Sequence, residues 1–199
     1  MVITGIYYAL GFLASGALVG YLTRPWAAIP FGIMAVFSLW FFRDPEREIP
    51  QGPYAVSPAD GVVVAVKDDA GGKRRISIFL SPFDVHVNRT PITGTVTKVQ
   101  YKPGKFLVAS REEATAENEQ NLVTVEGEGT TVEFSQIAGM VARRILFWRK
   151  PGDKVTMGER VGLIQFGSRC DIFLGPEWNI VVREGQRVSA GASILAKRI

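Results

Sequence analysis

Arg24 carries the only charge in the chain before Arg43. It lies in the segment Thr23-Arg24-Pro25, between two uncharged apolar runs, Val2–Leu22 and Trp26–Phe42. The first run is long enough for a helix that crosses a bilayer, and the second is at the lower limit. The sequence therefore predicts a membrane-anchoring, two-helix transmembrane hairpin over residues 1–42, followed by the polar linker Arg43–Pro50.

Two other interpretations of the apolar runs exist. A cleaved signal peptide fits poorly, because no basic residue precedes the first run and a second run follows it directly. A pair of buried helices in a soluble domain is the simpler alternative. A hairpin returns the chain to its starting side, and Arg43 and Arg47 predict that this side is the cytoplasm, although Arg24 in the turn is a counter-signal. The expected location is the cell membrane, with the following domain facing the cytoplasm.

The charge of the remaining chain limits its partners. The whole chain has a formal net charge of +4, of which Arg24 accounts for one, so residues 43–199 carry +3. The chain has no block of Lys and Arg and no basic stripe interleaved with aromatic residues, so no nucleic-acid partner is expected. A basic domain beside a membrane is suited to anionic lipid headgroups.

The chain has one cysteine and one histidine. Cys170 alone excludes an internal disulfide framework and a Cys-based zinc site, and we expect it to be a small buried hydrophobe. A single histidine, His86, argues against a catalytic metal centre built from histidines, which needs two or three. No metal is therefore expected.

After the linker, short β-branched and aromatic runs alternate with turns rich in Gly, Pro and Asp, which is typical of strands. The predicted strands are Val62–Val66, Ile76–Leu80, Val85–Val87, Gly94–Gln100, Leu122–Val125, Thr131–Gln136, Val161–Phe166, Ile172–Leu174, Ile180–Val182 and Ser193–Ala196. A compact, mainly β (α+β) domain over residues 43–199 follows.

An internal repeat supports this fold class. The segment Gly152–Val161 recurs further along the chain as Gly185–Ile194, and both read Gly-x-x-Val-x-x-Gly-x-x-aliphatic. This is a strand–turn–strand unit of the kind found in barrel-sandwich domains. Two copies are too few for a solenoid, so a barrel-sandwich-like domain is predicted.

Three residues are candidates for chemistry. The imidazole of His86 is a natural proton carrier, and the alternative is an ordinary hydrogen-bonded histidine in a strand. Asp60, in the turn Ser57-Pro58-Ala59-Asp60-Gly61, either shapes the turn or orients that imidazole, and Asp84 competes for the second role. Ser168 completes an Asp-His-Ser set. The chain has no Gly-x-Ser-x-Gly elbow, which argues against an ordinary serine-hydrolase fold.

Five motifs follow one another in a recognisable order. They are Arg43-Asp44-Pro45, Ser57-Pro58-Ala59-Asp60-Gly61, Ser81-Pro82-Phe83-Asp84-Val85-His86-Val87-Asn88-Arg89, Pro103-Gly104-Lys105-Phe106 and Phe166-Gly167-Ser168-Arg169. This series closely resembles the short-type phosphatidylserine decarboxylases, and the resemblance extends over residues 43–199.

The resemblance implies a proenzyme that cuts itself between Gly167 and Ser168, giving a β chain (1–167) and an α chain (168–199). Ser168 becomes an amino-terminal pyruvoyl group, which forms a Schiff base with the amine of phosphatidylserine and draws in the electrons left by CO₂. The product is phosphatidylethanolamine, an intermediate of phospholipid biosynthesis.

In the roles that the resemblance implies, His86 is the base and proton donor, and Asp60 orients it. Many longer members carry a second histidine three positions after the first, where this chain has Arg89. The sequence leaves open whether His86 serves self-cleavage, decarboxylation or both. A homodimer is expected from the resemblance alone.

A basic segment near residue 145 is a candidate for lipid contact. Arg143 and Arg144 precede the apolar residues Ile145–Trp148, a mixture suited to a membrane interface. We predict that the two arginines bind the lipid phosphate, and the alternative is an ordinary solvated basic edge.

Three other functions compete with this one. An archaetidylserine decarboxylase would use the same chemistry on other lipid tails. A membrane-tethered barrel-sandwich carrier or adaptor would explain the internal repeat, but neither copy has a lysine flanked by methionines to hold a prosthetic group. A serine hydrolase would use Ser168 without cleaving the chain.

Overall fold

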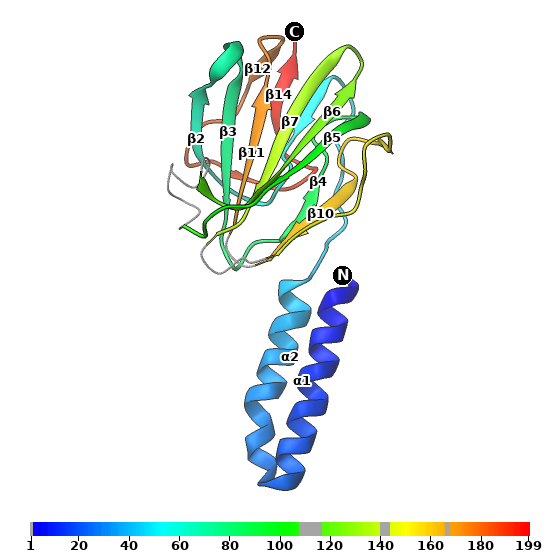
Figure 1. Cartoon of the computed structure of the whole chain (residues 1–199), viewed down its shortest axis with the longest axis vertical. Coiled ribbons are helices and arrows are strands. Elements are labelled where there is room, and N and C mark those ends of the chain that lie inside the picture. Colours follow the sequence, from blue (N-terminus) through cyan, green and yellow to red (C-terminus); the bar gives the residue numbers. More distant parts are fainter. Residues whose placement is uncertain (1, 108–116, 140–143, 166–167) are drawn as a thin grey trace. The chain divides into compact units, whose positions relative to one another are not determined.

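The computed structural model describes residues 2–107, 117–139, 144–165 and 168–199. The chain forms two compact units, Met1–Glu46 and Arg47–Ile199 (Figure 1). The first is helical, and the second, called the β unit below, is built from strands.

The amino-terminal unit is a helical hairpin. Helix α1 (Ile3–Leu22) is followed by the 3₁₀ turn η1 (Pro25–Ala28) and helix α2 (Ile29–Phe41). The amide of Val2 donates to the carbonyl of Phe42 at 3.0 Å, so the start of α1 meets the end of α2. Within the described residues, α1 is the one helix long and apolar enough to cross a membrane, while Pro25–Phe41 is shorter. The predicted pair of apolar helices is present, and its insertion in a membrane stays a prediction.

The β unit confirms the mainly β class. Its strands are β1 (Tyr54–Val56), β2 (Gly61–Asp68), β3 (Arg74–Leu80), β4 (Val87–Arg89), β5 (Gly94–Lys102), β6 (Gln120–Gly127), β7 (Thr130–Ile137), β8 (Ile145–Phe147), β9 (Lys154–Val155), β10 (Arg160–Ile164), β11 (Ser168–Leu174), β12 (Trp178–Ile180), β13 (Arg187–Val188) and β14 (Ile194–Arg198), with a short 3₁₀ turn, η2 (Ala70–Gly72). Each predicted strand overlaps an observed one, and four short strands, β1, β8, β9 and β13, were not predicted.

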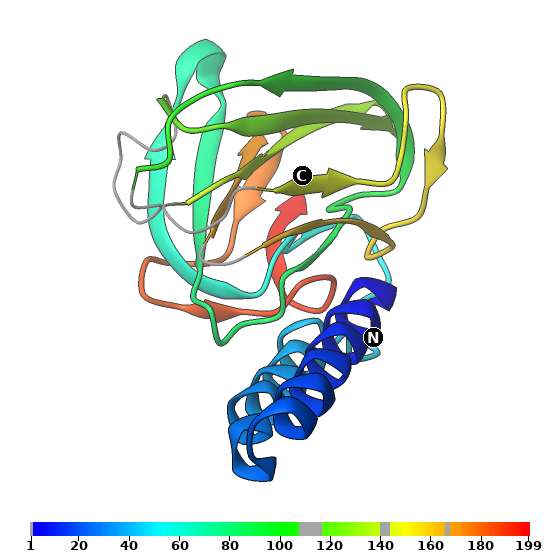
Figure 2. The same ribbon diagram turned by 60° about the horizontal axis from the view of Figure 1, so that its bottom comes forward.

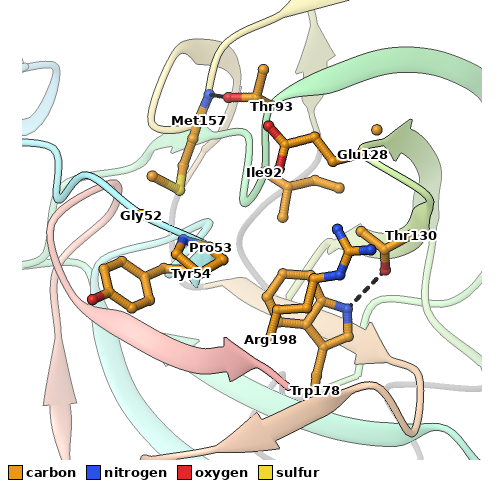
Figure 3. A pocket seen from close by; sticks show the side chains of 11 residues that line it. Gly52, Pro53, Tyr54, Ile92, Thr93, Glu128, Thr130, Met157, Trp178 and Arg198 are labelled. Carbon is orange, nitrogen blue, oxygen red and sulfur yellow. Dashed lines mark hydrogen bonds between the residues drawn. The ribbon is translucent and has the colours of Figure 1, made fainter.

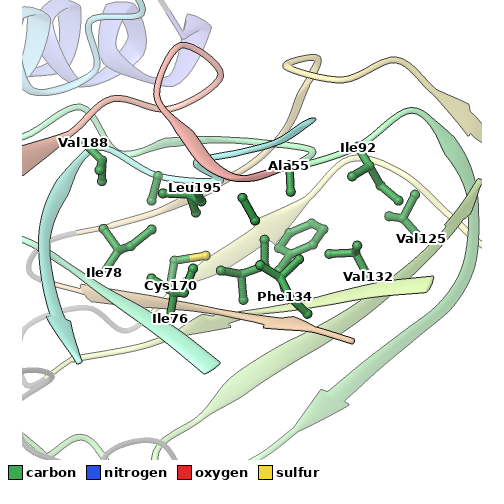
Figure 4. Close-up of a cluster of buried hydrophobic side chains, with 14 of the residues drawn as sticks. Ala55, Ile76, Ile78, Ile92, Val125, Val132, Phe134, Cys170, Val188 and Leu195 are labelled. Carbon is green, nitrogen blue, oxygen red and sulfur yellow. The ribbon is translucent and has the colours of Figure 1, made fainter. Parts of the chain in front are cut away.

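The strands form three antiparallel sheets. The largest has the order β13-β2-β3-β11-β7-β6-β5-β9, and two smaller sheets have the orders β1-β14-β12 and β4-β10-β8. In Figure 2 the strands curl around a common interior, with β14 (red) near its centre. Alternate side chains fill this interior with a continuous apolar core, which includes Ile76, Phe134 and Leu195 (Figure 4).

The internal repeat extends well beyond the two segments found in the sequence. We call the separation along the chain between Gly152 and Gly185 the repeat spacing. Four pairs of strands begin one repeat spacing apart: β1 and β4, β2 and β5, β8 and β12, β9 and β13.

The order of the strands in the sheets follows the same repeat. In the large sheet β13 and β9 form the two edges, and β2 and β5 lie next to them. The two small sheets are also equivalent, with β4-β10-β8 matching β1-β14-β12. The β unit therefore consists of two similar halves.

Reciprocal hydrogen bonds join these halves. The amide of Arg89 donates to the carbonyl of Pro58 at 3.0 Å, and the amide of Val56 donates to the carbonyl of Pro91 at 3.0 Å. The two donors are one repeat spacing apart, and so are the two acceptors, so the two bonds are equivalent. Such reciprocity is expected when two halves are related by a pseudo-two-fold axis.

The two repeat segments meet at their second glycines. A Cβ atom on Gly191 would lie 3.4 Å from the Cα of Gly158 and 3.0 Å from the Cδ1 of Ile49. Both glycines have left-handed φ angles, +79° at Gly158 and +76° at Gly191. The linker residue Ile49 thus packs on the junction where the two edge segments of the sheet approach each other, and only glycines leave room for it.

Gly158→Ala should destabilise the fold through this junction. The new methyl group would lie 2.5 Å from Ile49 Cδ1, whereas Gly152 has a similar φ of +96° and no atom within 4 Å. We expect the free energy of unfolding to fall by about 1–3 kcal/mol more for Gly158→Ala than for Gly152→Ala, because only the first is overpacked. Chemical denaturation of the full chain in detergent measures both. Adding Ile49→Ala to Gly158→Ala should recover part of the loss, and no recovery would contradict the proposed packing.

Candidate active site

Ser168 is the first residue of β11, an interior strand between β3 and β7 (Figure 1). It pairs with Leu80, the last residue of β3. Its side chain is fully buried, and its Oγ has no hydrogen-bond partner among the residues that the structure describes. A buried hydroxyl without a partner is costly and therefore uncommon. Gly167, the other residue of the predicted cleavage site, lies outside the described residues.

The residues after Ser168 anchor it from both faces of the sheet. The guanidinium of Arg169 is 1% exposed, and its Nε donates to the carboxylate of Asp171 at 2.6 Å. Its Nη2 donates to the hydroxyl of Ser77 on β3 at 2.6 Å. Cys170 points to the opposite face and belongs to the apolar core, as predicted, where burial raises the pKa of its thiol well above the ordinary value. The strand that begins at Ser168 is therefore firmly fixed at its first residues.

His86 is also fully buried, in the segment between β3 and β4. Its Nδ1 lies 2.9 Å from the main-chain carbonyl oxygen of Asp84. A carbonyl can only accept, so Nδ1 carries the proton in this contact. The neutral imidazole then has its lone pair on Nε2, which is the form needed for a base.

The carboxylate of Asp84 holds the turn that supplies this carbonyl. It accepts hydrogen bonds from the amide and hydroxyl of Ser81, at 2.8 and 2.7 Å, and from the guanidinium of Arg187 at 2.7 Å. Burial by itself raises the pKa of Asp84, but the hydrogen bonds from Arg187 and Ser81 outweigh it and bring the pKa below the ordinary value of 3.8. Sequence reasoning treated Asp84 only as a competitor for Asp60. The signal for its turn was Ser81-Pro82-Phe83-Asp84, with Pro at the second position.

The structure brings His86 and Ser168 to the same end of the β unit. The chain leaves β3 at Leu80, the partner of Ser168, and reaches His86 through the short turn that Asp84 holds. The amide of Ile164, at the end of β10, donates to the carbonyl of His86 at 3.2 Å. The chain passes from β3 to β4 at His86 and from β10 to β11 after Ile164, so both connections join the large sheet to the same small sheet.

Asp60 lies in a turn that packs on the residues after His86. The carbonyl of Pro58 accepts from the amide of Arg89 and from the side chain of Asn88, at 3.0 and 3.3 Å. The carboxylate of Asp60 accepts from the guanidinium of Arg47 at 2.8 Å and from the amide of Ala190 at 2.7 Å. Arg47 was not predicted as its partner. Orientation of His86 by Asp60 stays a prediction.

The other half of the fold repeats this arrangement with different side chains. Thr93 follows Asp60 by one repeat spacing, and its hydroxyl accepts from the amide of Met157 at 2.9 Å, just as Asp60 accepts from Ala190. Met157 and Ala190 are themselves one repeat spacing apart. The same main-chain donor is thus satisfied by a hydroxyl in one half and by a carboxylate in the other.

A small cavity marks the equivalent of the predicted site (Figure 3). Its lining includes Thr93, Pro53 and Thr130. Pro53 precedes His86 by one repeat spacing, and Thr130 begins β7 opposite the last residue of β6, as Ser168 begins β11 opposite the last residue of β3. The equivalents of all three predicted residues line one cavity. The pseudo-symmetry therefore supports the prediction that Asp60, His86 and Ser168 converge on one site in the other half. At about 50 Å³ the cavity has room for a few water molecules only.

The two equivalent hydroxyls differ in their hydrogen bonds. Thr130 Oγ1 donates to the carboxylate of Glu177. It accepts from the indole nitrogen of Trp178 at 3.0 Å (Figure 3). This hydrogen bond from Thr130 lowers the pKa of Glu177. The lone pairs and proton of Thr130 are therefore occupied, whereas Ser168 has no such partners within the described residues. Of these two hydroxyls, that of Ser168 is the one available for chemistry.

The structure also places two further residues named from the sequence. Arg144 is exposed, and its carbonyl accepts from the amide of Gln165 at 3.2 Å, so it lies beside Gln165. Arg143 lies outside the described residues. Arg89, at the position of the second histidine of longer relatives, is buried and donates to the carbonyl of Gly158 at 2.9 Å. Among the described residues no group of three or more His, Cys, Asp or Glu side chains could hold a metal ion.

Comparison with known sequences gives the family. The sequence model for phosphatidylserine decarboxylase matches residues 34–196. The chain belongs to the phosphatidylserine decarboxylase family. The phosphatidylserine decarboxylase proenzyme of Solibacter usitatus is 66% identical over 199 residues, covering 100% of this chain and 97% of its own length. Proenzymes of Chlorobium phaeovibrioides and Syntrophus aciditrophicus are 44% and 41% identical, covering 86% and 96% of this chain and 83% and 94% of their own.

Family membership confirms the resemblance drawn from the five motifs. The main prediction, a phosphatidylserine decarboxylase, holds over an archaetidylserine decarboxylase and over a barrel-sandwich carrier. The internal repeat that favoured the carrier is a real feature of this decarboxylase fold, since it generates both halves of the β unit.

The low pKa of Asp84 gives a pH-dependent contribution to stability. Because the folded-state pKa lies below 3.8, this contribution is complete above pH 3.8 and is lost as the pH falls through the folded-state pKa. At pH 7, Asp84→Asn should lower the free energy of unfolding by about 2 kcal/mol, the usual strength of hydrogen bonds to a charged group. The difference from wild type should shrink below pH 3.8. Denaturant titrations between pH 3 and pH 7 measure it, with the exposed Asp69→Asn as control, and a constant difference would contradict this account.

Proposed function

We propose that this chain decarboxylates phosphatidylserine after cutting itself between Gly167 and Ser168 into a β chain (1–167) and an α chain (168–199). The observation that carries the proposal is the buried Oγ of Ser168, which has no hydrogen-bond partner among the described residues although its pseudo-symmetric equivalent Thr130 has two. The curated relatives are named proenzymes, which supports maturation by cleavage.

The self-cleavage and the conversion of the new terminus would proceed in three covalent steps. Ser168 Oγ attacks the carbonyl carbon of Gly167, so that a C–O bond forms, the C–N bond breaks and the amide becomes an ester. Removal of the Cα proton of residue 168 then breaks the Cβ–O bond, which releases the carboxylate of Gly167 and leaves dehydroalanine. Addition of water and loss of ammonia give the pyruvoyl group.

His86 is the proposed base for these steps. Its Nδ1 proton is directed to the carbonyl of Asp84, which leaves Nε2 to take the proton of the Ser168 hydroxyl. The same nitrogen, once protonated, is the proposed acid that returns a proton to the substrate carbon after CO₂ leaves. Burial of both residues excludes water, so proton transfers between them are not diverted to solvent.

The residues around Ser168 fit an amino-terminal pyruvoyl group. When bound, this group supplies an electron sink for the pair of electrons that CO₂ leaves behind. The chain itself would hold it at the head of β11, fixed by pairing with β3 and by the buried contacts of Arg169 with Asp171 and Ser77. The new terminus would therefore be positioned by an interior strand.

The proposed location is the cytoplasmic face of the cell membrane, anchored by residues 1–42. The length and apolar character of α1 support it, and the substrate of the named relatives is itself a membrane lipid. Arg143 and Arg144 are proposed to bind the phosphate of the substrate. In favour of this role, Arg144 is exposed beside the segment leading to Ser168 and has no ion-pair partner among the described residues. A homodimer is proposed from the family resemblance.

The mass of the purified chain tests the cleavage. Wild type should give two fragments that match residues 1–167 and 168–199, the smaller without a free amino group. Ser168→Ala should remain a single chain and release no CO₂ from phosphatidylserine. The matched control is Thr130→Ala, which removes the equivalent hydroxyl of the other half and should cleave normally. An intact wild-type chain with full activity would overturn the proposal.

Asp60→Thr separates the two roles of Asp60. A threonine can still accept from the amide of Ala190, as Thr93 accepts from Met157, so the turn should persist while the carboxylate is lost. If the carboxylate orients His86, the rate of self-cleavage should fall about 10²–10⁴-fold. Arg47→Gln, which removes only the ion pair with Asp60, is the control and should cleave within a few-fold of wild type. Wild-type cleavage by Asp60→Thr would assign Asp60 to the turn alone.

Charge reversal tests the two arginines. Arg143→Glu combined with Arg144→Glu should raise KM for phosphatidylserine in vesicles about ten-fold or more, because two attractive contacts with phosphate become repulsive. Self-cleavage should persist. Lys98→Glu with Lys154→Glu, both exposed, makes the same change of net charge elsewhere. Equal KM values for the two double variants would show that Arg143 and Arg144 form an ordinary solvated edge.

A further inference from the structure

The turn that precedes His86 displays a large apolar side chain to solvent. Phe83 is 71% exposed, more than any other large apolar residue of the described β unit except the terminal Ile199. Its neighbour Pro82 is exposed as well, whereas Asp84 and the following residues through Ile92 are buried. An exposed aromatic side chain at a turn adjoining a catalytic residue suggests contact with a partner.

The turn is too well ordered for Phe83 to fold back into the domain. The amide of Asp84 donates to the carbonyl of Ser81 at 3.0 Å, and both the amide and the hydroxyl of Ser81 donate to the carboxylate of Asp84. The amide of Phe83 lies 3.3 Å from the hydroxyl of Ser81. The backbone thus presents the phenyl ring outward at a fixed position.

Cationic groups accompany the ring. Arg187 is 67% exposed and gives one nitrogen, Nη1, to Asp84, so the rest of its guanidinium faces solvent. Arg144 lies at the same end, since its carbonyl binds the amide of Gln165 and the next residue back, Ile164, binds the carbonyl of His86. An exposed phenyl ring with arginines at the same end of the unit is suited to the interface of an anionic bilayer.

We propose that the Phe83 turn (Ser81–Asp84 together with Arg187) inserts into the lipid interface and forms the entrance through which phospholipid reaches Ser168. This deepens the proposed function and rests on it. The partner is a bilayer surface, because the substrate of the family is held in a membrane by its acyl chains while Ser168 and His86 are both fully buried. The chain also enters the β unit at this end, where Arg47 pairs with Asp60.

The insertion can be measured directly with a fluorophore. Phe83→Cys in the full chain, labelled with an environment-sensitive dye, is reconstituted in nanodiscs that contain phosphatidylcholine and phosphatidylglycerol. The native Cys170 is fully buried with a raised thiol pKa, so it should not react while the protein is folded. The matched control is Thr131→Cys, exposed at the start of β7, at the opposite end of the large sheet from the start of β11.

We expect lipids that carry a quencher near the headgroup to quench the dye at position 83 at least several-fold more than the dye at position 131. We also expect a smaller difference in nanodiscs without phosphatidylglycerol, because Arg187 and Arg144 then lose their anionic partners. Equal quenching at the two positions would overturn the proposal.

Turnover gives an independent test. Phe83→Asp should lower turnover of phosphatidylserine in bilayers on the order of ten-fold more than turnover of a dispersed short-chain phosphatidylserine, because an aspartate cannot enter the interface. Phe83→Leu should restore most of the bilayer rate, and Thr131→Asp, with the same added charge, should leave the ratio of the two rates unchanged. An equal loss on both substrates would assign Phe83 to catalysis or folding and refute the docking role.

Failure of the two proposals can be distinguished. If the wild-type chain neither cleaves nor releases CO₂, the proposed function fails, whatever the dye reports. If it cleaves and releases CO₂ while the dye at position 83 stays in water, the docking proposal alone fails.

Discussion

The pairing of β11 with β3 and β7 is the contact on which the rest of the β unit depends. This strand is at the centre of the eight-stranded sheet, and its first residue is Ser168. The apolar core on one face and the buried hydrogen bond from Arg169 to Ser77 of β3 on the other fix its register. A residue at the head of such a strand has little freedom, so a reactive group formed there is held without help from a flexible loop.

The pseudo-two-fold symmetry separates the half that carries the proposed catalytic residues from an equivalent half that does not. Main-chain hydrogen bonds, glycines and prolines are equivalent in the two halves, while the side chains that matter for chemistry are not. Thr130 is hydrogen-bonded to Glu177 and Trp178, and Pro53 stands at the position equivalent to His86. The half without the proposed catalytic side chains therefore shows the same backbone arrangement with ordinary structural side chains.

Much of this architecture could be predicted from the sequence, and the failures have physical causes. Alternating apolar residues identified the longer strands, whereas β9 (Lys154–Val155) and β13 (Arg187–Val188) are too short to show a period. The repeat was visible at Gly152 and Gly185, where glycines are required. It was invisible at Asp60 and Thr93, because the two side chains differ although they accept the same hydrogen bond.

The candidate site could be predicted only in part, because some of its contacts depend on the fold and not on a local sequence motif. Ser168, His86 and Asp60 stand in motifs that resemble a known family, so the sequence named them as candidates. The contact of His86 with the carbonyl of Asp84 was not predicted, because it involves the main chain and depends on the fold of one turn. Arg47 and Arg187 are distant in sequence from the carboxylates they bind, and no local pattern relates them.

The position of Ser168 inside the sheet has a consequence for the life of the protein. A cut before Ser168 leaves a fragment that supplies β11 and β13 to the large sheet and β12 and β14 to a small one. Before the cut, refolding is an event within a single molecule and is independent of dilution. After it, two chains must find each other, so recovery from denaturation becomes second-order in protein concentration. Maturation would thus make the stability of the fold depend on the protein concentration.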